Sequence, residues 1–471
     1  MKTSGQLWSR HRRTVACAAL LGAGGIAALA CGDRDSVLGF EEPDASDREG
    51  GAELPPVSNY EGGADVDTSA EEDASVPFDG APDPVVCAVT PCVTQLAGGD
   101  TYFCALTSDG MVRCWGTDFS GSLGRPDFDA GADTAATPAP VEGLDNVTQL
   151  AARQAACALI DGGTVKCWGS NAAGQLGGFD PPTYDNLAHP SPAEVPLYES
   201  AVRVDTNDNY TCAVLASGKL ECWGWPNNGL LARPPGGIGV GGPDIATKIE
   251  AKVIRSSTGS AITEDGDLIT WGAILGRETS LPLSHPSFQP LPIPSLHDVY
   301  DVAAEATTMV GRPLGHACVV ASGLVYCWGT TNAYAALCTG LANVETEPVQ
   351  VPLSLGDGGF AKQVTVSKRN TCIRLDDGTV QCCGVDDFGQ LGKGAVTDGG
   401  LTLDEGVPVA PLLAPATAVT GDVVQVVLGG DTACALLREG SVECWGSNAY
   451  GQLGQGTRDT APHPVPVRVQ F

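Results

Sequence analysis

The sequence predicts an all-β repeat protein, and three observations support this fold class. One motif recurs seven times, most clearly as CALIDGGTVKCWGSNAAGQLG from Cys157 to Gly177. Its Trp-Gly positions are separated by 53, 55, 48, 57, 55 and 62 residues, a mean of 55, and such a period is typical of repeat architectures. Each copy has an apolar run, a polar triplet with glycine and an alternating run, which is a β-hairpin pattern. The seven positions are Trp115, Trp168, Trp223, Trp271, Trp328, Cys383 and Trp445.

Cysteines flank the expected hairpin turn in six of the seven copies. Five pairs centre on a three-residue loop ending in glycine, where a left-handed backbone needs no Cβ, so the paired cysteines lie opposite each other. Cys318 and Cys327 are one residue closer, and their loop is also one residue shorter. In the fourth copy both cysteines are absent together, replaced by Ser260 and Thr270. The pairs are Cys104 with Cys114, Cys157 with Cys167, Cys212 with Cys222, Cys318 with Cys327, Cys372 with Cys382, and Cys434 with Cys444.

We expect these six pairs to be structural disulfides in an oxidising compartment, since so many paired cysteines are unusual in a reducing cytosol. The alternative is that they are small buried thiols filling tight positions. The sequence leaves open the state of Cys87, Cys92, Cys338 and Cys383, because nothing in the hairpin symmetry places them together. No cluster has zinc-ligand spacing, so we expect no metal and no cofactor.

The first 30 residues have the pattern of an export signal. Basic residues precede an apolar run from Thr14 to Ala30, which is short for a membrane span and ends before Cys31. With a cysteine at the cleavage point, the segment resembles a bacterial lipoprotein signal, which implies acylation of Cys31. Gly32 follows it, which favours the outer membrane over inner-membrane retention. The alternative is cleavage elsewhere and a product without a lipid anchor.

Residues 31–84 form an acidic segment that we expect to be a disordered tether. From Gly32 to Pro84 it has 16 acidic and 2 basic residues and too little apolar surface to fold. The alternative interpretation is an acidic site for a metal or a partner.

The repeat from residue 85 to 471, with its recurring Pro-Val strand (Pro140-Val141, Pro348-Val349, Pro464-Val465), resembles the regulator of chromosome condensation repeat family. This resemblance implies a seven-bladed β-propeller, each blade of four antiparallel strands, and about 55 residues are enough for four short strands. A Trp-Asp repeat propeller is the near alternative, but its Gly-His and Trp-Asp signatures do not recur.

Charge limits the partners of this domain. The chain has a net charge of −30, and in residues 85–471 acidic residues outnumber basic ones 40 to 20. Nucleic-acid binding depends on lysine and arginine, so we expect no nucleic acid, and an anionic membrane surface is disfavoured for the same reason. We expect a monomeric propeller that meets the membrane only through its N-terminal lipid.

Four aromatic residues occupy comparable positions near the GQLG-type turn: Phe119, Tyr334, Phe388 and Tyr450. If the blades superpose, these rings lie on one face and can bind a protein or glycan partner. The alternative is that each ring caps the core of its own blade. The sequence contains no recognisable catalytic residues, so we predict an envelope-anchored binding module whose partner is unknown. The alternative function is an extracytoplasmic enzyme of sialidase-like or quinoprotein-like type.

Overall fold

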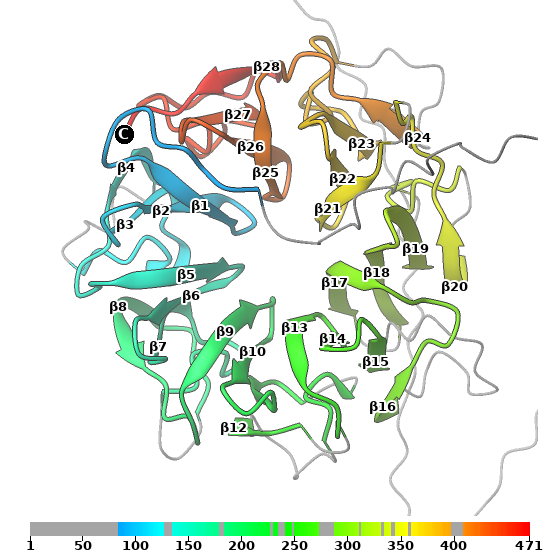
Figure 1. Cartoon of the computed structure of the whole chain (residues 1–471). Coiled ribbons are helices and arrows are strands. Elements are labelled where there is room, and N and C mark those ends of the chain that lie inside the picture. The colour runs from blue at the N-terminus through cyan, green and yellow to red at the C-terminus, as the bar shows by residue number, and fades with distance from the viewer. Residues whose placement is uncertain are drawn as a thin grey trace, which may run out of the picture. The chain divides into compact units, whose positions relative to one another are not determined.

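A computed structural model gives the fold of the repeat region (Figure 1). It describes residues 83–126, 134–178, 183–226, 229–233, 241–246, 249–272, 287–309, 312–330, 334–340, 344–356, 359–396 and 408–471. The predicted signal, Cys31 and most of the predicted tether therefore lie outside the described residues. Within the described residues, no helix has the length and apolar character needed to cross a membrane.

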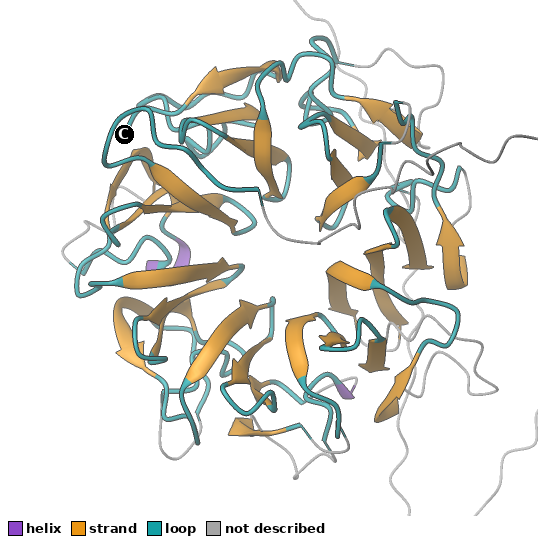
Figure 2. Cartoon of the chain, in the orientation of Figure 1, coloured by secondary structure: helices purple, strands orange, loops and turns teal. Residues whose placement is uncertain are grey.

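The described residues form seven antiparallel sheets of four strands each, arranged around a central channel. This confirms the predicted seven-bladed propeller, and nearly all of its regular structure is strand (Figure 2). We number the blades 1 to 7 along the chain, and the first strand of each blade lies next to the channel.

The strands of blades 1 to 3 are β1 (Val93–Gly98), β2 (Tyr102–Thr107), β3 (Val112–Thr117), β4 (Thr134–Pro140), β5 (Val147–Ala152), β6 (Ala155–Ile160), β7 (Val165–Ser170), β8 (Ala188–Glu194), β9 (Ala201–Thr206), β10 (Tyr210–Leu215), β11 (Leu220–Gly224) and β12 (Gly241–Ile245). Those of blades 4 and 5 are β13 (Val253–Ser257), β14 (Ser260–Thr263), β15 (Leu268–Gly272), β16 (Ser287–Pro292), β17 (Val299–Met309), β18 (Arg312–Ala321), β19 (Leu324–Thr330) and β20 (Val344–Gln350). Those of blades 6 and 7 are β21 (Ala361–Val366), β22 (Asn370–Leu375), β23 (Val380–Val385), β24 (Val409–Pro415), β25 (Val423–Leu428), β26 (Thr432–Leu437), β27 (Val442–Gly446) and β28 (His463–Arg468).

The hairpin between the second and third strands has the predicted register in every blade. Cys104 lies directly opposite Cys114, and Ser260 lies opposite Thr270 in the blade without cysteines. Gly110 ends the three-residue loop of blade 1 with a φ of 77°, so this position does require a left-handed backbone. The six cysteine pairs are disulfides in the structure, with Cα atoms 4.1 to 4.2 Å apart. Two further disulfides join Cys87 to Cys92 and Cys338 to Cys383.

The hydrophobic core is divided among the seven seams between neighbouring blades. One cluster of buried residues joins blades 1 and 2, and equivalent clusters join each later pair. The cluster between blades 7 and 1 closes the ring, with Leu96 and Val424 on its two sides. Each blade is one continuous stretch of chain, so the ring closes by packing and not by exchange of a strand.

The repeated tryptophans lie in these seams and are fully buried. Each indole N–H that has a described partner donates to a backbone carbonyl in the GQLG-type turn of the preceding blade. The pairs are Trp115 with Gln452 at 2.8 Å, Trp168 with Ser122 at 3.0 Å, Trp223 with Gln175 at 2.8 Å, Trp271 with Leu230 at 2.8 Å and Trp445 with Gln390 at 3.0 Å. The tryptophans are therefore wedges that link one repeat to the next.

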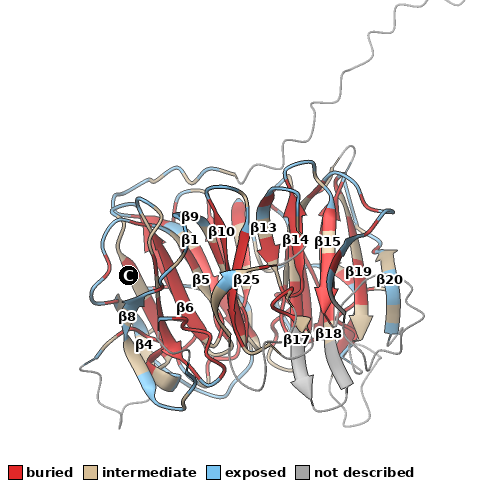
Figure 3. Ribbon diagram, turned by 90° about the horizontal axis from the view of Figure 1, so that it is seen from below, coloured by how far each residue is buried: buried red, intermediate tan, exposed pale blue. Residues whose placement is uncertain are grey.

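The outer strand of each blade is an edge strand, and its sequence discourages pairing with a strand of another chain. These strands are exposed in part, as β20 is in Figure 3, whereas the second and third strands of the blades are largely buried. Prolines occur in them, among them Pro190 and Pro192 in β8 and Pro464 and Pro466 in β28. Because proline has no N–H to donate, it suits an edge strand and discourages pairing with another chain.

Candidate interaction site

The propeller has two faces, which we name from the chain segments they carry. The turn face carries the link between the first and second strands (residues 99–101 in blade 1) and the GQLG-type turn (residues 118–124 in blade 1). These lie at one edge of the blade, since the N–H of Thr117 donates to the carbonyl of Thr101 at 3.0 Å. The hairpin face carries the loops between the second and third strands and the links between blades, joined by a bond from the Val147 N–H to the Gly110 carbonyl.

The four candidate aromatic residues all lie on the turn face, one on each of blades 5, 6, 7 and 1. These four blades are neighbours, because blade 7 adjoins blade 1 in the closed ring. Phe119 is 67% exposed, Tyr450 44% and Tyr334 36%. Phe388 is half-buried, because the N–H of His463 in β28 donates to the Phe388 carbonyl at 3.0 Å and brings the next blade over this turn. The three exposed rings thus form an arc along the face, with Phe388 partly covered between them.

Counted from the repeated Trp-Gly position, the four rings are not all strictly equivalent. Phe388 and Tyr450 lie five residues after that position, Phe119 four and Tyr334 six. In blade 1 the fifth position is Ser120, and Phe119 instead begins a short 3-10 helix. The aromatic character of this turn is therefore shared, but its register shifts by one residue in blades 1 and 5.

The insertion from residue 179 to 199 is described only from residue 183 onward. Tyr198 is 68% exposed and lies in a link between blades, on the hairpin face. Tyr184 is 55% exposed, and its ring lies 5.5 Å from that of Trp225, edge to face. Tyr198 therefore does not join the arc of turn-face aromatics. Tyr184 lies beside the GQLG-type turn of blade 2, since the Asp185 N–H donates to the Asn171 carbonyl at 3.1 Å.

Ion pairs fill the channel mouth at the centre of the turn face. Arg153 of blade 2 is paired with Glu305 of blade 5, across the channel, and lies 3.8 Å from Asp100 and 3.7 Å from Asp208. Lys368 of blade 6 reaches Asp100 at 2.8 Å and Asp208, on blade 3, at 3.1 Å. Because these pairs join blades on opposite sides of the ring, they close the channel at this end.

A second group of charges lies further out, next to the aromatic arc. Arg369 donates to Asp387 at 2.8 Å and to Asp431 at 2.7 Å, and its guanidinium lies 5.6 Å from the ring centre of Tyr334. The cation therefore lies in position for a cation–π contact that orients the Tyr334 ring.

The electrostatics of this mouth do not resemble those of a catalytic centre. Burial and the charge of Asp100 raise the pKa of Tyr102 well above its ordinary value, so its phenol is not activated as a nucleophile. Burial alone would raise the pKa of Asp100, but Arg153 and Lys368 outweigh it and lower the pKa. A cluster of arginine, tyrosine and acidic residues at the channel mouth would favour the enzyme alternative, and Arg153, Tyr102 and Asp100 lie close together there. The cations of this group and of its neighbour are, however, already paired with carboxylates.

No group of three or more His, Cys, Asp or Glu side chains within the described part of the chain is arranged to hold a metal ion. The charged network was not predicted from the sequence, because its members lie in short links that vary from blade to blade. A weak signal existed: Asp100, Arg153, Asp208 and Lys368 all fall between the first and second strands of their repeats.

Comparison with known proteins agrees with this architecture. The family model described as regulator of chromosome condensation repeat matches residues 93–122, 423–452 and 439–471. The human E3 ubiquitin-protein ligase HERC2 is 28% identical over 65% of this chain, but the match spans only 6% of that ligase. The ultraviolet-B receptor UVR8 of Arabidopsis thaliana is 27% identical over 77% of this chain and 79% of its own length.

Among solved structures, Prp20p from Saccharomyces cerevisiae matches with a TM-score of 0.62 and 20% identity, covering 82% of this chain and 88% of that chain. At this identity the likeness shows the fold alone. These matches identify regulator of chromosome condensation repeats in the first and last blades, and the seven hairpin registers and the tryptophan wedges extend the same pattern around the ring.

Proposed function

We propose that this protein is a binding module whose turn face docks a partner polypeptide. The observation that carries the proposal is the arc of exposed rings, Phe119, Tyr334 and Tyr450, on neighbouring blades of a rigid scaffold. Aromatic side chains supply large contact area with little rotamer entropy to lose, which is why they dominate protein interfaces. Similar propellers support this use, since the yeast propeller Prp20p binds Gsp1p and histones.

The channel mouth supports binding in preference to catalysis. Its cations are paired with carboxylates, and its buried tyrosine is held in the protonated form. The activities of the longer relatives are not carried over, because the match to the ubiquitin ligase spans so little of it.

Capture experiments with matched variants test the proposal. We expect Tyr334→Ala and Tyr450→Ala each to weaken binding of a partner recovered from envelope extracts by about 2 kcal/mol or more. Tyr198→Ala is the matched control, because it removes a more exposed tyrosine from the hairpin face. Binding should also tolerate salt, since apolar contacts are little affected by ionic screening. Equal capture by all three variants, with unchanged melting temperatures, would return the rings to a structural role.

We also propose that the propeller is held at the bacterial envelope through an acylated Cys31, with the acidic segment as its tether. The support is the sequence of the first 84 residues alone. Two or three acyl chains anchor a protein firmly, as one does not. Cys31→Ser should therefore leave unprocessed or released protein, and a variant that stays in the membrane fraction with the parent N-terminus would contradict the anchor.

A further inference from the structure

The channel end on the hairpin face is lined by seven equivalent side chains, one from the third position of each inner strand. In four blades this residue is a glutamine that binds the neighbouring blade. Gln95, for example, donates to the Leu150 carbonyl at 3.1 Å and accepts from the Leu150 N–H at 2.9 Å. In blades 3 to 5 charged residues take its place. The seven are Gln95, Gln149, Arg203, Arg255, Asp301, Gln363 and Gln425.

In two of these blades, 3 and 5, a carboxylate accepts the backbone N–H of the next blade that a glutamine oxygen accepts elsewhere. Asp301 accepts the Val364 N–H at 2.8 Å, as a glutamine oxygen does elsewhere. Asp205, two residues after Arg203, accepts the Ser256 N–H at 3.3 Å in the same way. The two arginines pair with the same carboxylates, Arg203 with Asp205 at 2.9 Å and Arg255 with Asp301 at 2.6 Å. Two ion pairs therefore take the place of glutamines at the hairpin-face end of the channel.

Two further cations bind one carboxylate at this hairpin-face end of the channel. Asp83 lies just before the first strand, and its carboxylate accepts from Lys362 at 3.0 Å and from Arg374 at 2.6 Å. The Arg374 side chain is only 3% exposed, that of Lys362 13% and that of Asp83 16%. Burial alone would raise the pKa of Asp83, but the bonds from Lys362 and Arg374 outweigh it and lower the pKa. The site is therefore built to hold an ionised carboxylate.

The cavity is larger and more cationic than Asp83 requires. Its volume is about 450 Å³, and four cations line it against two carboxylates, while a third carboxylate, Asp205, pairs with Arg203 but does not line the cavity. Within the described residues, the buried Nε atoms of Arg255 and Arg374 have no hydrogen-bond partner. A buried guanidinium N–H without an acceptor is costly, so these donors favour a further anionic group. The lining cations are Arg203, Arg255, Lys362 and Arg374, and the lining carboxylates are Asp83 and Asp301.

We propose that the hairpin-face end of the channel is a binding site for a carboxylate on an acidic polypeptide segment, and that Asp83 occupies it as an intramolecular ligand. A carboxylate is favoured over a phosphate because Asp301 also lines the cavity and would repel a second negative charge on the ligand. The site lies on the face opposite to the aromatic arc, so the inference does not depend on the function proposed above.

Asp83 is held near the site by its own segment. The N–H of Val86 donates to the Arg438 carbonyl at 2.7 Å, and Arg438 donates to the Pro84 carbonyl at 3.3 Å. An intramolecular ligand acts at a high effective concentration, so an external carboxylate must compete with it. Removing the Asp83 carboxylate while keeping the segment should therefore unmask the site.

The test measures binding of a labelled, capped peptide with the sequence of residues 78–86 to the full-length protein. We expect Asp83→Asn to bind the peptide at least 10-fold more tightly than the parent. Lys362→Met in the Asp83→Asn background should remove this gain, and so should Arg374→Gln if that variant folds. Lys252→Met is the matched control, because it removes an exposed lysine that is paired with Glu264 away from the cavity. A peptide with asparagine at position 83 should bind much more weakly.

Competition distinguishes the sources of the anion. Acetate should displace the peptide from the Asp83→Asn variant, whereas inorganic phosphate at the same ionic strength should not. Equal displacement by phosphate would overturn the carboxylate assignment. Peptide binding by Asp83→Asn that is no tighter than that of the parent, or that survives Lys362→Met, would overturn the site and leave Asp83 as a simple anchor of its segment.

Discussion

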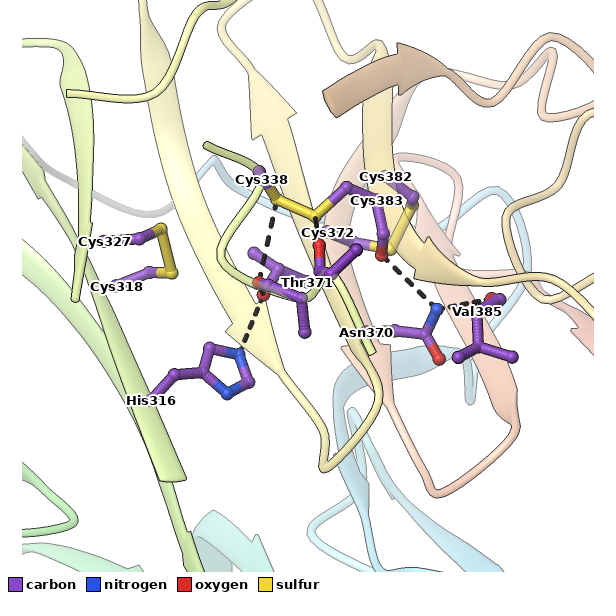
Figure 4. The surroundings of a disulfide bond; sticks show 12 residues. His316, Cys318, Cys327, Cys338, Asn370, Thr371, Cys372, Cys382, Cys383 and Val385 are labelled. Carbon is purple, nitrogen blue, oxygen red and sulfur yellow. Dashed lines mark hydrogen bonds between the residues drawn. A yellow bond between two sulfur atoms is a disulfide. The ribbon is translucent and has the colours of Figure 1, made fainter. Parts of the chain in front are cut away.

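The seam between blades 5 and 6 differs in chemistry from the seam between blades 6 and 7, although the same repeat builds both. At the second seam Trp445 lies on Gly392, where an added Cβ would come within 2.9 Å of the indole Nε1. At the first seam Cys383 takes the tryptophan position and Cys338 takes the glycine position, and the two form a disulfide (Figure 4). The tryptophan and the glycine are thus a coupled pair: without the indole, the position of the glycine has room for a side chain.

The hydrogen bonds at the seam between blades 5 and 6 also differ from those at the seam between blades 6 and 7. His316 of β18 donates from Nε2 to the Thr371 hydroxyl at 3.0 Å, and that hydroxyl donates to the Ala336 carbonyl at 2.7 Å (Figure 4). Ala336 corresponds to Gln390, whose carbonyl accepts the Trp445 indole at the other seam. The threonine contact is not specific to this seam, because the equivalent Thr211 donates to the Gln175 carbonyl at 2.9 Å, which the Trp223 indole also reaches. At the first seam the indole is absent and the threonine donor is retained.

The largest effect is expected from Trp445→Ala. Removal of a fully buried tryptophan should destabilise the propeller by about 3 to 5 kcal/mol, and the Gln390 carbonyl loses its donor as well. Urea denaturation of the oxidised protein measures this loss. A loss below about 1 kcal/mol would mean that the tryptophan contributes little to the free energy of unfolding. The difference between the two seams would then have little effect on stability.

Removing the bridge at the other seam, with Cys338→Ala and Cys383→Ala together, should cost somewhat less. The bridge spans 45 residues, so chain entropy gives it about 4 kcal/mol, against about 3 kcal/mol for a hairpin bridge that spans 10. The Cys104→Ala, Cys114→Ala double variant is the matched control. If the hairpin variant loses more stability than the seam variant in the same denaturation series, the seam does not depend on its covalent link.

His316 should make the first seam sensitive to acid. Burial and the charge of Arg153 lower its pKa from 6.5 to about 4, so the folded protein keeps the neutral ring while the unfolded chain takes up a proton below pH 6.5. Stability should therefore fall as pH falls from 6.5 to about 4, by about 3 kcal/mol over the whole window. The difference between the parent and His316→Gln at each pH isolates this term from the carboxylates. A constant difference between pH 7 and 4.5 would contradict it.

Much of this architecture follows from local sequence patterns. The spacing of each cysteine pair around its turn predicts the hairpin register, because a hairpin is a short-range structure in which the loop length determines which residues face each other. The period predicts the number of blades. The same logic covers the fourth blade, where Ser260 and Thr270 face each other without a bridge.

The bridge between Cys338 and Cys383 could not be predicted in this way, because it joins two repeats. Its signal was present: Cys338 follows Leu337 where a glycine follows Leu453, and Cys383 replaces tryptophan in the next repeat. Interpreting that signal requires knowing that the wedge of one blade lies on the turn of the preceding blade, which only the folded ring shows. The partial burial of Phe388 depends likewise on β28, a strand more than 70 residues away.

The smallest effect is expected from Gly392→Ala, which tests the coupling itself. Gly392 has a φ of 66°, and a left-handed alanine costs about 1 to 2 kcal/mol even where there is room for its side chain. In the parent the new Cβ would also press on the Trp445 indole, so the total should exceed this conformational cost.

In the Trp445→Ala background the contact with the indole is gone, and only the conformational cost should remain. A double-mutant cycle from urea denaturation measures the difference, which should be about 1 kcal/mol. Strictly additive losses would show that glycine is needed here for its backbone alone, and that Cys338 is accommodated for reasons unrelated to the missing tryptophan.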